Sequence, residues 1–157
     1  EVIRDSILKV SGLLDERMFG AGTLDERMKR RSIYFMIKRS KLIPSMQLFD
    51  SPEPLVSQGR RPATIIAPQA LHFMNNGQVR ASAMELARQL KAQPDTAAAV
   101  TLGYQTVLGR APTSKEQRSI ASFIDVQEKS YTNNGRELAL ADFVQVLFGL
   151  NEFIYPE

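Results

Sequence analysis

The sequence predicts a mainly α-helical protein, a single-domain bundle of about five to seven helices with one short strand or hairpin near residues 31–39. Two observations support this prediction. Apolar residues recur at spacings of three and four along most of the chain, and the polar breaks between these stretches carry helix caps and turn residues. The 157 residues, of which 43% are hydrophobic, suffice for one core. We therefore expect residues 1–157 to form a single α-rich domain.

The first half of the chain alternates short elements with loops. Helical spacing predicts an amphipathic helix over 1–14, and a glycine-containing loop follows it. Residues 31–39 have the β-branched and aromatic content of a strand. Pro44 suits the first position of a short helix, because it lacks the amide hydrogen that this position leaves unused. Four prolines stiffen a long predicted loop at 50–68.

The second half is predicted to be helical from Pro68 onward. Asn75, Asn76 and Gly77 form a helix stop that tolerates left-handed backbone, and the next helix covers about 78–92. Another helix opens at Pro94-Asp95, and a capping box of Thr113 and Glu116 starts the one after it. The last helix, about 136–150, is apolar on nearly every side and is therefore predicted to be the most buried.

The composition excludes several chemistries. With no cysteine, disulfides, thiolate metal sites, covalent c-type haem attachment and cysteine nucleophiles are impossible within this chain. The single histidine, His72, stands beside Phe73 in an apolar stretch and is interpreted as a packing or surface residue. No motif for phosphate binding, metalloprotease or esterase chemistry is present. We assign the chain no cofactor, no metal and no catalytic residue, and no apolar run is long enough to span a membrane.

The charge is unevenly distributed. Residues 1–80 carry 13 basic and 8 acidic side chains, and much of this excess lies between Arg27 and Lys41. Such a cluster fits a solvated rim or a docking surface for an acidic neighbouring domain. Nucleic-acid binding is not expected, since the rest of the chain lacks the signature of a nucleic-acid-binding fold.

A second polar group lies around the proline-rich loop. Arginines just before a helix start are suited to receive an anion or a partner, because guanidinium groups and helix-start amides both favour negative charge. The alternative is structural: Arg61 pairs with a carboxylate, while Gln69 and Asn75 satisfy backbone groups. The candidate anion- or partner-binding residues of both clusters are Arg30, Arg31, Arg39, Arg60, Arg61, Gln69 and Asn75.

Several long segments resemble one known family. They are the runs 31–35, 38–44, 48–50, 67–71, 73–75, 104–113 and 150–155, together with Pro52, Gly59, Arg61 and Thr64. In this order they are similar to domain-of-unknown-function family 1553, also called planctomycete-specific domain one. Members often carry a hydroxyl-rich stretch where this chain has Ile65 and Ile66, which puts any ligand role of that stretch in doubt here.

The resemblance implies context rather than a mechanism. It implies a C-terminal module of large exported bacterial proteins, which is often preceded by another uncharacterised domain and by a cytochrome-c-like haem domain. The chain is accordingly expected to be a fragment of a longer, extracytoplasmic protein whose partners are the upstream domains of the same polypeptide.

Two functions follow as hypotheses. In the first, the chain is a non-catalytic helical scaffold and interaction module, and the basic rim and the proline-rich loop contact an upstream domain. In the second, Arg60, Arg61, Gln69 and Asn75 contribute substrate contacts to an active site that an upstream domain completes, in polysaccharide or redox chemistry.

Overall fold

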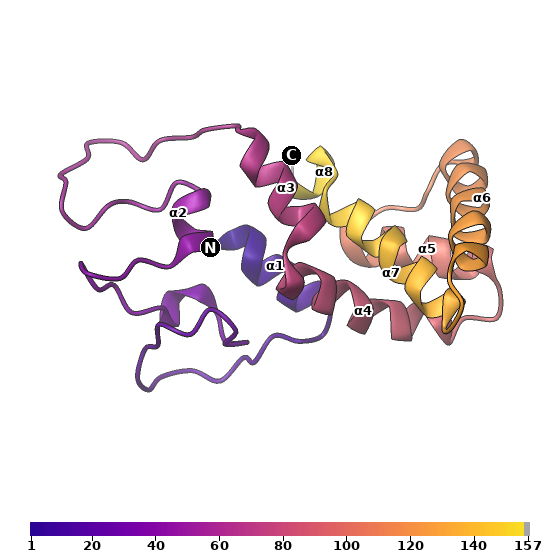
Figure 1. Ribbon diagram of the computed structural model, residues 1–157, viewed down its shortest axis with the longest axis horizontal. Coiled ribbons are helices and arrows are strands. Elements are labelled where there is room, and N and C mark those ends of the chain that lie inside the picture. Colours follow the sequence, from indigo (N-terminus) through magenta and orange to yellow (C-terminus); the bar gives the residue numbers. More distant parts are fainter. Residues whose placement is uncertain (156–157) are drawn as a thin grey trace.

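Eight α-helices and one 3-10 turn make up the regular structure of residues 1–155, the part of the chain that the computed structural model describes (Figure 1). The prediction of a mainly helical bundle is confirmed. Six of the helices have nine residues or more, and two are short. The elements are α1 (Val2–Val10), η1 (Ser32–Tyr34), α2 (Pro44–Leu48), α3 (Ala67–Asn75), α4 (Gly77–Lys91), α5 (Thr96–Leu108), α6 (Ser114–Ser130), α7 (Gly135–Phe148) and α8 (Asn151–Ile154).

The core is built around α7, as its all-round apolar sequence predicted. Seven of its residues are buried, and α4 and α6 pack along it. Helix α5 also contacts α7 and lies at the same end of the molecule as α6 (Figure 1). Gly103 of α5 lets the two helices approach closely, because a Cβ there would lie 2.7 Å from Cε1 of the buried Phe143 ring. The buried residues of α7 are Ala139, Leu140, Ala141, Phe143, Val144, Leu147 and Phe148.

Local signals set most helix ends in this half. Asp95 accepts the Ala98 amide at 2.7 Å and begins α5, and Gly109 ends that helix with a left-handed φ of 71°. The predicted capping box at Thr113 and Glu116 is present at the start of α6. The helix stop before α4 differs from prediction, because Asn76 is extended rather than left-handed (φ −74°, ψ 125°). Its side chain caps α4 instead, accepting the Gln78 amide at 2.8 Å.

The strand predicted over 31–39 is wrong as a regular strand. Residues 32–34 form η1, and only isolated bridges occur, such as the one between Thr23 and Phe35. A hairpin is present in minimal form, as one antiparallel bridge between Lys38 and Lys41. The β-favouring side chains are there, but no neighbouring strand in residues 1–155 pairs with them, and a strand needs a partner for its backbone groups.

Arg4 of α1 holds this irregular segment against the helices. Its guanidinium donates to the carbonyls of Met28 and Arg30 and to the Ser32 hydroxyl, and lies 4.7 Å from the centre of the Phe35 ring. The helix itself stops at Val10 rather than at residue 14, since Gly12 adopts a left-handed φ of 73°. Long loops on either side of η1 and α2 therefore occupy the end of the molecule opposite α5 and α6 (Figure 1).

Candidate functional site

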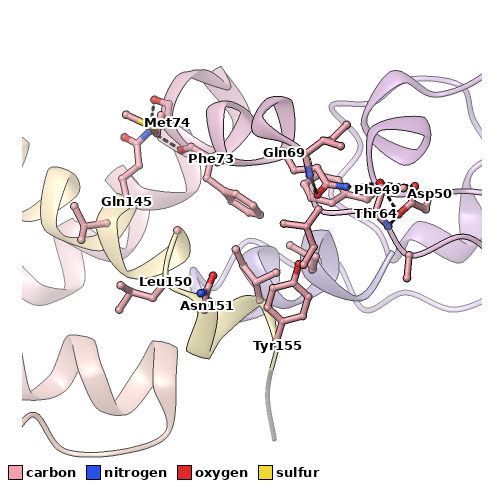
Figure 2. Close-up of a pocket in the computed structure, with 18 of the residues that line it drawn as sticks. Phe49, Asp50, Thr64, Gln69, Phe73, Met74, Gln145, Leu150, Asn151 and Tyr155 are labelled. Atoms are coloured by element: carbon pink, nitrogen blue, oxygen red, sulfur yellow. Dashed lines mark hydrogen bonds between the residues drawn. The ribbon is translucent and has the colours of Figure 1, made fainter.

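A cleft of about 940 Å³ lies between the proline-rich loop, α3 and the end of the chain at α7 and α8. Figure 2 shows the loop residues Phe49, Asp50 and Thr64 on one side and Asn151 and Tyr155 on the other. Most of its surface is apolar. The apolar lining side chains include Ile65, Ile66, Phe73, Met74, Phe123, Val146, Leu150 and Ile154.

The loop wall is held by Asp50, which follows α2 with a left-handed φ of 59° that aspartate tolerates better than most residues. Its carboxylate accepts the backbone N–H of Thr64 at 2.7 Å and the Thr64 hydroxyl at 2.9 Å. Asp50 thereby closes the segment 51–63 into a loop. The Arg61 Nε donates to the Asp50 backbone carbonyl at 2.6 Å, and this second contact also holds the two ends of the loop together.

Gln69 joins this wall to α3. Its side chain is buried, and its Nε2 donates to the Leu48 carbonyl at 3.0 Å. Its Oε1 accepts the Ile66 amide at 3.2 Å, one of the helix-start amides without an intrahelical acceptor. Gln69 thus satisfies two backbone groups that burial would otherwise penalise.

The opposite wall is fixed by Gln145 of α7. Its Nε2 donates to the carbonyls of Phe73 at 2.9 Å and Met74 at 2.7 Å, which are free carbonyls at the end of α3 (Figure 2). Arg80 of α4 donates to the Gln145 Oε1 at 3.1 Å and to Asp142 at 2.7 Å. The cleft wall is therefore tied into the helical core.

Asp142 also accepts the Tyr131 hydroxyl at 2.8 Å. This hydrogen bond, together with burial and the nearby negative charge, raises the pKa of Tyr131 above its ordinary value. Because Tyr131 ends α6, this hydrogen bond joins the end of α6 to α7.

Two of the seven candidate residues line the cleft, Arg61 and Gln69. Besides the Asp50 carbonyl, Arg61 contacts the Glu1 carboxylate at 3.0 Å, so it ties the first residue of the chain to the loop. Both residues have the contacts that the structural alternative predicted: a carboxylate for Arg61 and backbone groups for Gln69. Asn75 differs, because its side chain is exposed and makes no hydrogen bond within residues 1–155.

The remaining candidates lie away from the cleft. Arg30 stacks on Tyr34, with its guanidinium carbon 3.5 Å from the ring centre, and donates to the carbonyls of Arg17, Phe19 and Ala21. It holds the glycine-containing loop in place. Arg31, Arg39 and Arg60 are exposed. The seven candidate residues therefore do not form one site in the structure. Some of them hold loops in place, and the others are exposed to solvent.

His72 is packed, as predicted. It is half-buried, with its ring centre 5.6 Å from that of Phe49 and 6.0 Å from that of Phe73. Burial lowers the pKa of His72 below its ordinary value, against the opposing effect of the Glu26 carboxylate.

The strongest charge cluster lies outside the cleft. Arg110 donates to Glu116 at 2.8 Å and to Glu152 at 2.6 Å, so one guanidinium joins the residues after α5 to the starts of α6 and α8. These hydrogen bonds, with those from Thr113, lower the pKa of Glu116 to about 2. The same contacts raise the pKa of Arg110. Both carboxylates bind the one guanidinium of Arg110, which is the arrangement of a structural clamp.

Sequence reasoning missed six polar residues of the cleft: Asp50, Gln127, Asp142, Gln145, Asn151 and Tyr155. Each belongs to the site through the packing of distant segments. The one available signal was the apolar stretch that closes the chain at 153–155, next to a helix predicted to be central.

Residues 1–155 hold neither a membrane-spanning helix nor a cluster of metal ligands. No helix there is long and apolar enough to cross a membrane. In the same range, no three histidine, aspartate or glutamate side chains gather as a ligand set for a metal ion.

The fold and the cleft define a class of protein: a mainly helical protein with an open, largely apolar cleft. The chain belongs to the family described as PSD1, protein of unknown function (DUF1553), whose sequence profile matches residues 1–124. The match includes the cleft's loop wall and α3 and ends within α6, so α7, α8 and the similar segment at 150–155 lie beyond it. No curated protein and no solved structure matches the chain.

Proposed function

We propose that this chain is a non-catalytic interaction module of a larger, exported multidomain protein, and that its cleft receives an apolar surface of another domain of the same polypeptide. One observation carries the proposal. Five polar residues of the cleft already form hydrogen bonds within the chain, whereas many apolar side chains that line the cleft are exposed to solvent. The five are Asp50, Thr64, Gln69, Asp142 and Gln145.

The energetics of such a surface favour docking. Met74 is 68% exposed and Ile65 is 83% exposed, and both line the cleft. Covering apolar surface of this kind contributes roughly 25 cal/mol for each Å² removed from water. Exposed apolar surface that is contiguous and concave commonly marks an interaction site.

The first residues of α1 lie at the edge of the cleft. Glu1 contacts Arg61 on the loop wall, and Ile3 lines the cleft itself. A domain joined to Glu1 would start at the edge of the cleft, where a short connection gives a high effective concentration. The family resemblance, which implies upstream domains in an exported protein, points the same way.

The test uses two methionines of nearly equal exposure. Met74→Glu places a charge in the cleft, whereas Met18→Glu places one at a residue that is 69% exposed and lies outside the cleft. Binding of each variant to the separately expressed upstream part of the polypeptide is measured by calorimetry. We expect Met74→Glu to weaken binding at least about tenfold and Met18→Glu to leave it unchanged.

Two results would overturn the proposal. One is the absence of binding by the unmodified chain, and the other is equal weakening by both variants. Loss of turnover by the full-length protein on Arg61→Ala, with an unchanged melting temperature, would instead support a substrate site completed by the upstream domain.

A further inference from the structure

A second large depression lies beside the minimal hairpin at 38–41. It is a groove of about 770 Å³ between α1, α2 and the segment 31–43. Its apolar lining includes Phe35, Met36, Leu42 and Ile43. Ile33 and Ile37 line it as well, although they are 73% and 82% exposed. Side chains of this kind are normally covered.

The backbone of the hairpin arms is unpaired. Between Ile37 and Leu42, the one backbone hydrogen bond among residues 1–155 is that from the Lys41 amide to the Lys38 carbonyl, at 3.0 Å. The residues on either side are extended, with φ −70° and ψ 130° at Phe35 and φ −83° and ψ 115° at Ile43. Their own groups are in use, since the Phe35 amide donates to the Ser32 carbonyl at 3.0 Å and the Ile43 carbonyl accepts the Met46 amide at 3.0 Å. The backbone groups left for a partner are therefore those between Ile37 and Leu42. Extended backbone with free amides and carbonyls is a template for an added strand.

The charges around the groove are positive and unpaired. Arg31 and Lys41 line it, and Lys38 and Arg39 form the tip of the hairpin. None of these four exposed cations makes an ion pair within residues 1–155.

The carboxylates of the groove are already engaged. Asp5 is paired with Arg4 at 3.3 Å, and it also accepts the Ser32 amide at 2.8 Å and the Ser32 hydroxyl at 2.7 Å. Glu1 is paired with Arg61. The net field at the groove is therefore that of the four unpaired cations.

From these three observations we infer that the groove binds an extended, acidic segment of a partner polypeptide, which pairs with the backbone of the hairpin arms. The apolar side chains of the segment cover Ile33 and Ile37, and its carboxylates face Arg31 and Lys41. A peptide suits this site better than a lipid bilayer does, because the apolar surface lines a depression rather than a protruding tip. The groove shares Arg61 with the cleft, but the residues that carry the inference line the groove and not the cleft, so it does not depend on the cleft's role.

The binding test uses a fluorescein-labelled ten-residue peptide of alternating valine and glutamate, with fluorescence anisotropy as the readout. The comparison probes are the same peptide with lysine in place of glutamate, and vesicles containing phosphatidylserine. We expect the glutamate peptide to bind at least about tenfold more tightly than the lysine peptide, with an affinity that falls as salt rises.

Two double variants test the charges. Arg31→Glu with Lys41→Glu is expected to weaken binding of the glutamate peptide at least about tenfold. The matched control is Lys115→Glu with Lys129→Glu, which reverses two exposed lysines of α6 that also form no ion pair within residues 1–155, and it should leave binding unchanged.

The backbone pairing has its own readout. Peptide binding is expected to slow hydrogen exchange of the amides between Ile37 and Leu42, and Ile37→Pro is expected to weaken binding because proline has no amide hydrogen. Equal binding of both peptides, no binding of the glutamate peptide, or binding of the vesicles alone would each overturn the inference.

Discussion

The carboxylate of Asp50 accepts both the backbone amide and the hydroxyl of Thr64, at 2.7 and 2.9 Å, and so closes the proline-rich loop across 13 intervening residues. Asp50→Ala removes both hydrogen bonds and leaves a side chain less tolerant of a φ of 59°. We expect a loss of about 1–2 kcal/mol in the free energy of unfolding, measured in urea. Hydrogen exchange at the Thr64 amide should accelerate.

A control within the same loop is Ser57→Ala, since the Ser57 side chain makes no hydrogen bond within residues 1–155 and is exposed. Unchanged exchange at Thr64 in Asp50→Ala would contradict the closing role of Asp50.

Gln69→Leu tests whether Gln69 is structural. Leucine keeps the side-chain size but leaves the Leu48 carbonyl and the Ile66 amide without their partner. The unfolding free energy should fall by about 1–3 kcal/mol. Gln105→Leu, at an exposed position of α5, should change it by less than about 0.5 kcal/mol. A stable Gln69→Leu protein would show that the buried amide is dispensable to the fold.

Gly103→Ala tests the contact between α5 and α7. The added methyl group would lie 2.7 Å from Cε1 and 3.0 Å from Cζ of Phe143, a ring with no room to move because it is fully buried. Overpacking of this kind costs about 1–3 kcal/mol. Gly77→Ala is the matched control, since nothing lies within 4 Å of its Cβ position. There alanine should be neutral or stabilise by up to about 1 kcal/mol. Equal effects at the two glycines would refute the packing argument.

The Arg110 clamp makes stability depend on pH. The pKa of Glu116 falls from an ordinary value of 4.5 to about 2 in the folded protein, so the unfolded chain takes up this proton first as pH decreases. The stabilisation from Glu116 is therefore complete above about pH 4.5 and is lost as pH falls towards 2. We expect the melting temperature of Glu116→Gln to fall less between pH 5 and 2 than that of the unmodified protein. Equal decreases in the melting temperature of the two proteins would show that Glu116 does not contribute to the pH dependence of stability.

Features encoded within a few neighbouring residues were predictable from the sequence. The helix start at Asp95 and the capping box at Thr113 each need only local chemistry, and each was found where predicted. The all-round apolar character of α7 likewise identified the most buried helix.

Features that join distant segments were not predictable. Nothing near Gln145 indicates that it binds the end of α3, more than 70 residues earlier, and nothing near Arg110 points to Glu152. The strand prediction at 31–39 failed for the same reason. Its side chains favour extended structure, but a strand also needs a neighbour, and whether the chain supplies one is a property of the whole fold.

Gln145 gives the cleft a practical property. The same side chain lines the cleft, holds the end of α3 and accepts from Arg80 of the core, so the wall cannot detach without loosening the bundle. An occupant that binds the folded form alone therefore raises the temperature at which the entire bundle melts. Thermal-shift screening can report occupancy of the cleft without any enzymatic assay.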